Sequence, residues 1–526
     1  MLTMMAQMPI LLALLLLWAP QAEAKLLQII HTNDLHSHFE HAQDYAKGHY
    51  AAVKATIDRL KRDAQAQGID TLTLDAGDFT EGTQFFLPSR GEFSWRLMDE
   101  LGYDAVALGN HDYLMGQDEL DRLLASTNPK FKLLCANFDV FDGLKHLKKH
   151  LKPYAEFKKS GARIAVVGLT TDEWEYGWRA GELVIDPPGE VLPGVLKRLR
   201  RKNDFVIALT HVGVDGDKQL AAANNVDLIV GGHEHRFLYD YLSVKNPSGR
   251  VVPIVQAGEH GEVVGDLLVD VTPGEPLRVV RYQLVPVAQG GPRDAAVDAH
   301  VAAARSELER EYGTEWLAEP IGYSEVPMTR PRFETTEWGD LVVEGMRNAV
   351  HADMALDTGD LFGDNQPAGP VTREKLFVLY PRVFDLGERF GWTVWTVHIY
   401  GWLLKIALEQ ALHLGFVFTI SGATYDVTGP PGKEKIANLK IGNRPVKWYK
   451  DYTVALPEGI GRAADEMIEL VKLALRSPTD SRIPVWAAVE AELVRLGGVV
   501  KPRAHQLRVL SAAQRAHLLS PASACH

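Results

Sequence analysis

The chain has 526 residues, of which 46% are hydrophobic and 24% are charged, and its formal net charge is −12 at pH 7. This composition is typical of a globular protein long enough for two or three domains, and it argues against a disordered, collagenous or polytopic membrane chain. A net acidic chain lacks the surplus of Lys and Arg that replaces phosphate counterions, so a partner that is a nucleic-acid polymer is disfavoured. A small anionic substrate stays open, because bound metal ions can supply positive charge locally.

The first residues have the features of an export signal. Residues 10–18 form an apolar run too short to span a bilayer, and Ala22, Glu23 and Ala24 form an A-x-A cleavage pattern. We therefore predict a signal peptide over residues 1–24, no stable membrane insertion after cleavage, and a periplasmic or secreted protein. No Lys or Arg precedes the apolar run, which leaves an uncleaved membrane anchor as the alternative.

The two cysteines, Cys135 and Cys525, lie far apart in the sequence. They are too few for a cysteine-rich zinc site. We interpret Cys135 as a buried thiol and Cys525 as part of the tail, and a disulfide between them stays open.

From residue 25 to 293, short apolar runs alternate with amphipathic helical stretches, which predicts an α/β sandwich. The expected buried strands are residues 26–30, 71–74, 105–108, 206–209 and 228–230. Each of them ends in a polar cluster. In layered α/β folds, ligands gather beyond the carboxyl ends of the strands.

A Gly- and Pro-rich break at residues 290–292 is followed by a helical pattern over residues 294–312. Apolar side chains recur there at helical spacing, at Val297, Val301, Ala304, Leu308 and Tyr312. We predict a linker over residues 294–315. The remainder, residues 316–526, has further strand and helix signals, such as 392–399 followed by 402–412, and is predicted to be a second α/β domain.

The five strand-end clusters carry carboxylate, amide and imidazole groups. In chain order they contain Asp34 and His36, Asp78, Asn110 and His111, His211, and His233 and His235. This set suits two divalent ions of the Zn, Mn, Fe or Co type. One carboxylate, Asp78, can bridge ions about 3.5–4 Å apart, the usual spacing for in-line phosphoryl displacement. A single cluster would be explained by a turn or a helix cap, but five clusters after five strands predict a metal site.

At these residues the sequence resembles the 5′-nucleotidase family of calcineurin-like metallophosphoesterases. The stretches that carry the resemblance are residues 31–38, 108–112 and 256–261 in the first half and 421–426, 438–441 and 452–456 in the second. The resemblance implies a four-layer α/β-β/α sandwich domain over 25–293 and a smaller α/β C-terminal domain over 316–526 that sets substrate specificity. It further implies an enzyme that hydrolyses a small phosphate monoester, above all a 5′-nucleotide, by metal-activated water.

The resemblance also assigns residue roles. The first ion would be held by Asp34, His36, Asp78 and His235, and the second by Asp78, Asn110, His211 and His233. Asn110 would also touch the substrate phosphate. His111 would not be a ligand; it would stabilise the charge that develops on the phosphoryl group and help to protonate the leaving oxygen. Three other histidines are expected to be structural or to support the ligands, namely His31, His38 and His260.

Three positions depart from the family pattern. Leu114 stands where the family has an Asp that orients the catalytic His, which predicts weaker catalysis unless another residue takes that role. Phe362 replaces an Arg that helps to bind the nucleotide. Gly459 replaces an aromatic residue that stacks on the base, although Asp465 of the same motif is present. Phe384 is a candidate for one wall of a base clamp, with a core aromatic residue as the alternative.

These departures leave two alternatives open. One is a related two-metal hydrolase of another ester: a 2′,3′-cyclic nucleotide, a nucleotide sugar, a non-nucleotide phosphoester or a sulfur ester. The other is a non-catalytic binding protein of the same fold. The sequence fixes neither the native metals nor the oligomeric state.

Overall fold

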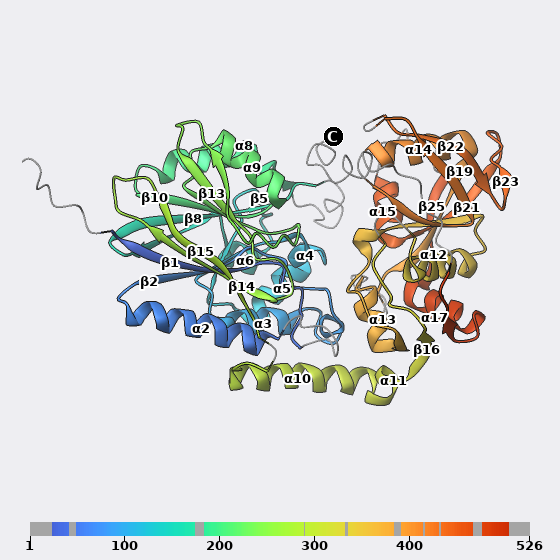
Figure 1. Ribbon diagram of the computed structural model, residues 1–526, viewed down its shortest axis with the longest axis horizontal. Helices are drawn as coiled ribbons and strands as arrows, with labels where there is room; N and C mark the ends of the chain where they lie inside the picture. The colour runs from blue at the N-terminus through green and yellow to red at the C-terminus, as the bar shows by residue number, and fades with distance from the viewer. Residues whose placement is uncertain are drawn as a thin grey trace, which may run out of the picture.

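The computed structural model describes residues 24–40, 49–173, 184–288, 290–331, 335–382, 391–413, 416–430, 433–466 and 476–503. It shows two lobes joined by helices α10 (Ala295–Tyr312) and α11 (Thr314–Ala318), which run along one side of the molecule (Figure 1). Most of the expected signal peptide, Phe384 and Cys525 lie outside the described residues, and Cys135 is a buried free thiol. Within the described ranges, we find no helix with the length and apolar character that crossing a membrane requires.

The first lobe contains two large sheets. Their strand orders are β15-β14-β1-β2-β3-β4-β6 and β12-β13-β11-β10-β8-β7. The first sheet is made of β1 (Leu26–Thr32), β2 (Asp70–Asp75), β3 (Ala105–Ala107), β4 (Lys132–Leu134), β6 (Leu151–Lys152), β14 (Val263–Asp270) and β15 (Arg278–Pro286). The second is made of β7 (Tyr154–Lys159), β8 (Ala162–Thr170), β10 (Phe205–His211), β11 (Leu228–Gly231), β12 (Leu242–Lys245) and β13 (Val251–Val255). All five predicted strands are present, as β1, β2, β3, β10 and β11.

Alternating side chains along these strands explain the layers. In β10, Ile207 and Leu209 belong to the core between the sheets, whereas Val206 and Ala208 pack against helices on the outer face. Those helices are α8 (Pro188–Leu199) and α9 (Gly213–Ala223). The outer face of the first sheet is covered by α2 (Tyr50–Ala66), α3 (Glu92–Leu101) and α5 (Gln117–Thr127). The order helix, sheet, sheet, helix confirms the predicted four-layer sandwich.

Shorter elements complete the first lobe. They are η1 (Gln84–Phe86), α4 (Asn110–Tyr113), β5 (Phe138–Asp139), α6 (Lys145–His150) and β9 (Val184–Ile185). Of these, η1 and α4 follow the ends of β2 and β3, so they lie close to the predicted site.

The linking helix forms where the sequence pattern places it. Asp294 caps α10 by accepting hydrogen bonds from the backbone N–H groups of Ala296 and Val297. The five apolar residues at helical spacing are all buried. They attach α10 to α2 and α3 of the first lobe, while α11 contacts α13 (Arg373–Leu379) of the second. The limits of the predicted domains stay predictions.

The second lobe is a smaller α/β unit. Its sheets have the orders β20-β17-β24-β19-β25, β18-β16-β26 and β21-β22-β23. The strands are β16 (Pro320–Ser324), β17 (Met354–Thr358), β18 (Gly369–Thr372), β19 (Thr393–Tyr400), β20 (Phe418–Ser421), β21 (Ala423–Thr428), β22 (Lys435–Ile441), β23 (Arg444–Pro445), β24 (Asp451–Pro457), β25 (Arg476–Pro484) and β26 (Val499–Val500). Its other helices are α12 (Glu337–Ala349), η2 (Gly359–Leu361), α14 (Gly401–His413), α15 (Glu458–Glu466) and α17 (Val485–Arg495). The strand β19 followed by the helix α14 matches the sequence prediction.

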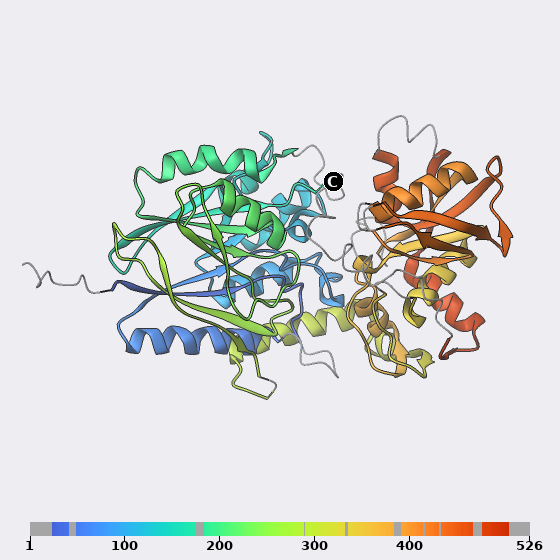
Figure 2. The ribbon, with the colours of Figure 1, turned by 45° about the horizontal axis from the view of Figure 1, so that its top comes forward.

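Polar contacts tie the lobes together beside the predicted site. Arg305 of α10 donates to Glu40 of the first lobe and to Glu374 of the second, at 2.7 Å each. Gln84 of η1 also donates to Glu374, at 2.7 Å. The loops after β1 and β2 therefore face the second lobe, which lies beside the first in both views (Figures 1 and 2).

Candidate active site

The predicted clusters converge because their strands are parallel. β1 pairs with β2, β2 with β3, and β10 with β11, all in parallel, so their carboxyl ends lie at the same edge of each sheet. The backbone N–H of Asp34 donates to Gly77 at 2.9 Å, which joins the turns after β1 and β2. His211, at the end of β10, reaches across and its Nδ1 lies 2.7 Å from the carbonyl of Ala76. The two sheets thus deliver their strand-end residues to one place.

The backbone at this place is strained. Five of the seven predicted ligands have positive φ angles, namely Asp34 (53°), His36 (45°), Asp78 (58°), His233 (91°) and His235 (58°). Residues other than glycine rarely adopt this conformation. Such strain persists only where surrounding contacts impose it, and it gathers at functional sites.

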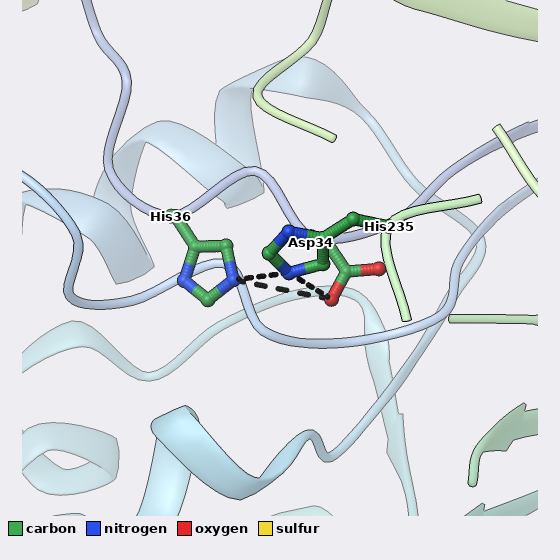
Figure 3. Close-up of side chains that lie close together, drawn as sticks. All are labelled: Asp34, His36 and His235. Atoms are coloured by element: carbon green, nitrogen blue, oxygen red, sulfur yellow. Dashed lines mark hydrogen bonds and ion pairs between the residues drawn. The ribbon is translucent and has the colours of Figure 1, made fainter. Parts of the chain in front are cut away.

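The first group of predicted ligands is Asp34, His36 and His235, whose side chains point toward one another (Figure 3). The Nε2 atoms of His36 and His235 are 3.1 Å apart. Asp34 Oδ1 lies 3.3 Å from His235 Nε2 and 3.9 Å from His36 Nε2. Tetrahedral ligands bound at about 2.0–2.1 Å are separated by roughly 3.4 Å, so these three atoms fit around one ion.

The second group is Asp78, His211 and His233. His211 Nε2 lies 2.9 Å from Asp78 Oδ2 without forming a hydrogen bond of acceptable geometry. The Nδ1–H of His211 donates to Ala76, which leaves the Nε2 lone pair for a metal. Asn110 is buried, and its Oδ1 has no hydrogen-bond partner among the described residues. The Asn110 oxygen without a hydrogen-bond donor and the lone pair of His211 Nε2 are both available to coordinate a cation.

Asp78 faces both groups. Its Oδ2 lies 2.9 Å from His211 Nε2 and 3.9 Å from His36 Nε2. Gly109 permits this position, because a Cβ there would overlap with the backbone nitrogen and the carboxylate of Asp78. Asp112 fixes the turn by accepting from the N–H groups of Gly109 and Asp78 at 2.9 and 3.0 Å.

The charges of the site support each other. Burial opposes ionisation of Asp78, but the imidazoles of His211, His111 and His36 hold its pKa well below the ordinary value. Burial likewise opposes charge on His211, yet the Asp78 carboxylate raises the pKa of that ring to about 10. For His235, burial opposes the positive charge, but the carboxylates of Asp34 and Glu259 outweigh it and raise the pKa of the ring to about 10. A divalent cation would replace the protons that these pairs otherwise hold.

Two carboxylates that were not predicted from the sequence contact histidines that we predict to bind metal. Glu259 Oε2 lies 2.5 Å from His235 Nδ1, and Glu173 Oε2 lies 2.8 Å from His233 Nε2. Histidines that bind metals commonly donate their second ring N–H to such a group. Glu173 follows the end of β8, so the position after a strand, from which the ligands are predicted, also indicates Glu173.

A third such carboxylate, that of Glu81, contacts His111, where the family pattern has an Asp at the position of Leu114. His111 Nδ1 lies 2.5 Å from Glu81 Oε2, and His111 Nε2 lies 4.0 Å from Asp78 Oδ2. Leu114 is instead buried in the apolar cluster around α5. The carboxylate beside His111 thus comes from the turn after β2, 30 residues away in the sequence, and was not predicted from the positions next to His111.

In the second lobe, Phe362 is a core residue. It is fully buried, and its ring centroid lies 6.1 Å from that of Trp338 and 5.6 Å from that of Tyr380. Asp465 lies in α15, but its side chain is outside the described residues, as is all of Phe384.

Gly459 is covered by an aromatic ring from elsewhere. A Cβ at Gly459 would overlap with the ring of Trp392. The guanidinium of Arg382 lies 5.9 Å from the centroid of that ring and 3.8 Å from the carboxylate of Glu81. Arg382 therefore brings a positive charge of the second lobe next to the Glu81–His111 pair.

Known proteins with similar sequences or structures share both lobes. The profile described as Calcineurin-like phosphoesterase matches residues 27–237, and the profile of the 5′-nucleotidase C-terminal domain matches residues 320–472. The chain is 29% identical over 510 residues to a 5′-nucleotidase of Rattus norvegicus, which covers 86% of this chain and 85% of the relative. It is 29% identical over 485 residues to a 5′-nucleotidase of Vibrio cholerae, which covers 82% and 84%. The crystal structure of a 5′-nucleotidase precursor from Thermus thermophilus has a TM-score of 0.79 at 25% identity, covering 92% of this chain and 98% of that one.

The fold and the family profiles together define a metal-dependent phosphoric ester hydrolase. Both family domains are present in the expected order. The chain belongs to the 5′-nucleotidase family of calcineurin-like metallophosphoesterases.

Proposed function

We propose that the chain is an exported two-metal phosphomonoesterase that acts on 5′-nucleotides. The observation that carries this proposal is the Asp78 carboxylate, which faces two separate groups of ligating side chains. The first ion would be held by Asp34, His36, Asp78 and His235, and the second by Asp78, Asn110, His211 and His233.

When bound, the two ions would place positive charge against the phosphoryl oxygens and lower the pKa of the attacking water. Asn110 would direct its Oδ1 to the second ion and donate from Nδ2 to a phosphoryl oxygen. His111 would use Nε2, the ring nitrogen nearer to Asp78, to stabilise developing charge and to protonate the leaving oxygen. Glu81 would hold this ring by accepting from Nδ1–H, which fixes the orientation of the ring.

Nucleotide specificity rests on the likeness to 5′-nucleotidases across both lobes. The departures at Phe362 and Gly459 require that other residues bind the nucleotide. Arg382 is suited to bind the phosphate, because its positive charge lies next to Glu81, which contacts His111. Asp465 and Phe384 remain our candidates for the nucleoside side, within a specificity domain that we place at residues 316–526.

The export part of the proposal rests on the pattern over residues 1–24. It places the mature chain, with its sandwich domain over 25–293 and linker over 294–315, in the periplasm or outside the cell. Mass spectrometry of the protein recovered after expression in a bacterial host should show a mature chain that begins at Lys25. An intact N-terminus in the membrane fraction would overturn this part alone.

The substrate part is tested by phosphate release from AMP and from an aryl phosphate, measured on the chelated chain after Mn²⁺ or Zn²⁺ is restored. Base stacking contributes about 1–3 kcal/mol, so we expect kcat/KM for AMP to be higher by about tenfold or more. Equal values would overturn nucleotide recognition but not phosphomonoester hydrolysis. The panel also includes cyclic nucleotides, nucleotide sugars and sulfur esters. If none of these esters is hydrolysed, the chain is a binding protein instead.

A further inference from the structure

Four large apolar side chains of the second lobe are exposed side by side. Trp402 and Ile406 lie on α14, and Trp448 and Tyr449 lie in the turn before β24; together we call them the aromatic patch. The exposed fractions of Trp448 and Tyr449 are 70% and 59%, and those of Trp402 and Ile406 are 48% and 44%. The rings of Trp448 and Tyr449 meet edge to face, with their centroids 5.7 Å apart. Apolar side chains exposed singly are ordinary, whereas a gathered set marks a place where a protein binds a partner or a membrane.

The fold brings the two halves of the aromatic patch together. Trp402 and Ile406 are four residues apart on α14, which places them on one face of the helix. The backbone N–H of Trp402 donates to the carbonyl of Trp448 at 3.1 Å. Gly401 permits this approach, because a Cβ there would lie 2.5 Å from the carbonyl oxygen of Lys447. The start of α14 and the turn before β24 therefore form one continuous surface.

Positive charge surrounds the aromatic patch. Residues 444–450 contain Arg444, Lys447 and Lys450 and no acidic residue, and Lys405 lies between the two apolar positions of α14. Lys405 and Lys450 each lie near one acidic side chain, at 3.6 and 3.5 Å. Within the described part of the chain, neither Arg444 nor Lys447 forms a salt bridge. The net charge of the whole chain is −12, so this surface is more positive than the molecule as a whole.

The charge disfavours a second copy of the chain as the partner of this surface. In a symmetric dimer, each patch would contact the same patch of the other copy. Arg444 and Lys447 would then lie close to identical cations, and like charges brought together across an interface destabilise it. A partner of opposite charge that also accepts aromatic rings fits instead.

An anionic membrane surface has both properties. Trp and Tyr rings sit at the level of the lipid head groups, where one end of the side chain is in an apolar environment and the other is in water. Lys and Arg side chains beside them are attracted to the phosphates of acidic lipids. Because the rest of a net acidic chain is repelled by such a surface, the positive patch would also set the orientation in which the protein approaches it.

We propose that the aromatic patch docks the protein on the surface of a membrane that contains anionic lipids. The contact would be peripheral: the rings would enter the head-group region, and the four cations around them would contact lipid phosphates. Strand β23, which carries Arg444, lies at the end of the second lobe that points away from the first lobe (Figure 1). A membrane bound there would leave the proposed metal site uncovered. The proposal goes beyond the proposed function and does not depend on which ester is hydrolysed.

Sedimentation with lipid vesicles tests the proposal. The full mature chain is mixed with vesicles of phosphatidylcholine, or of phosphatidylcholine and phosphatidylglycerol in equal parts, and the bound fraction is measured after centrifugation. Each Lys or Arg at an anionic surface strengthens binding by about fivefold. We therefore expect binding to the anionic vesicles to be tighter by about tenfold or more, and to be lost at high salt. Equal binding to both kinds of vesicle, or binding to neither, would overturn the proposal.

Two variants test whether the aromatic patch makes the contact. Trp448→Ala removes the most exposed ring and should weaken binding to the anionic vesicles by about tenfold. Lys447→Glu should weaken it by about tenfold or more, because an attracted charge is replaced by a repelled one. Tyr239→Ala is the matched control, since Tyr239 lies in the first lobe and is also 70% exposed. Wild-type binding in both Trp448→Ala and Lys447→Glu would overturn the proposal.

Sedimentation velocity without lipid tests the second copy as the partner. We expect the wild type and Trp448→Ala to sediment alike, because the aromatic patch is not used between copies of the chain. A dimer of the wild type that dissociates in Trp448→Ala would show that a second copy covers the patch, and it would overturn docking on a membrane.

Discussion

At the scale of single residues, carboxylates that contact histidine rings organise the site. Glu81, Glu173 and Glu259 each lie within 2.8 Å of a ring nitrogen of a site histidine. That the proposed metal ligands would lie together was predictable, because they follow apolar strands directly. Glu81 was not, because its role depends on how the turn after β2 packs against His111, and a single sequence does not show that contact.

Replacing Glu81 should weaken catalysis more than metal binding. In Glu81→Gln the ring of His111 keeps a neighbour of similar size but loses the negative charge that holds it. General acid–base catalysis contributes about 10²–10⁴-fold, so we expect kcat to fall by about 10²-fold with little change in KM or in metal content. Steady-state kinetics should separate the fall in kcat from KM, and Glu81→Asp should recover part of the rate. Wild-type kcat in Glu81→Gln would contradict the assigned role.

His31 should make the fold sensitive to acid. It is fully buried beside Tyr282, neither ring nitrogen has a hydrogen-bond partner among the described residues, and burial lowers its pKa to about 3. Between pH 6.5 and 3 the unfolded chain binds a proton that the folded chain does not. The free energy of unfolding is therefore unaffected by this proton above pH 6.5. Between pH 6.5 and pH 3 it falls by about 1.4 kcal/mol for each unit by which the pH is lowered.

The measurement is urea unfolding of the wild type and His31→Leu at pH 7 and pH 5, with a chelator present in both. From pH 7 to pH 5, the free energy of unfolding of the wild type should fall by about 2 kcal/mol more than that of His31→Leu. Identical pH dependence would show that His31 does not titrate on unfolding as described.

At the scale of elements, the strands were predictable and the turns were not. Apolar runs located β1, β2, β3, β10 and β11, and helical spacing located α10, because both patterns follow from which face is buried. The turns after the strands depend on close backbone approaches instead. At Gly109, the absence of a side chain is what allows the turn after β3 to touch the turn after β2.

Adding one methyl group at Gly109 should therefore disrupt the site. In Gly109→Ala the new Cβ would overlap with Asp78, so the bridging carboxylate must move. We expect loss of at least one metal equivalent and a fall in kcat of about 10²-fold or more. The matched control is Gly189→Ala in α8, where nothing lies within 4 Å of the added Cβ. Equal metal content and activity in the two variants would contradict this reading of the turn.

At the scale of the whole molecule, the second lobe approaches the site through residues other than the two positions at which it departs from the family pattern. Phe362 and Gly459 stand at the two positions that depart from the family pattern. Phe362 is packed in the core, and Gly459 lies under the ring of Trp392. Arg382 and Asp364 instead reach across to the first lobe. Contacts between lobes depend on their relative placement, which local sequence patterns do not encode.

Removing the charge of Arg382 tests this contribution. If Arg382 binds the substrate phosphate, Arg382→Ala should raise KM for AMP by about tenfold or more, since a hydrogen bond to a charged group contributes about 1.5–3 kcal/mol. Arg462→Ala is the control, because Arg462 pairs with Glu458 within α15. Similar KM values in the two variants would place the phosphate contact elsewhere.

The proposed activity depends on Asp78, which would join two ions into one phosphoesterase site. Its most direct test is phosphate release from AMP by the chelated chain, with and without restored Zn²⁺ or Mn²⁺, compared between the wild type and Asp78→Asn. We predict that the chelated wild type is inactive, that metal restores it, and that Asp78→Asn stays inactive at every metal concentration. Metal-independent hydrolysis, or full metal-dependent activity in Asp78→Asn, would show that Asp78 does not bridge a catalytic pair of ions.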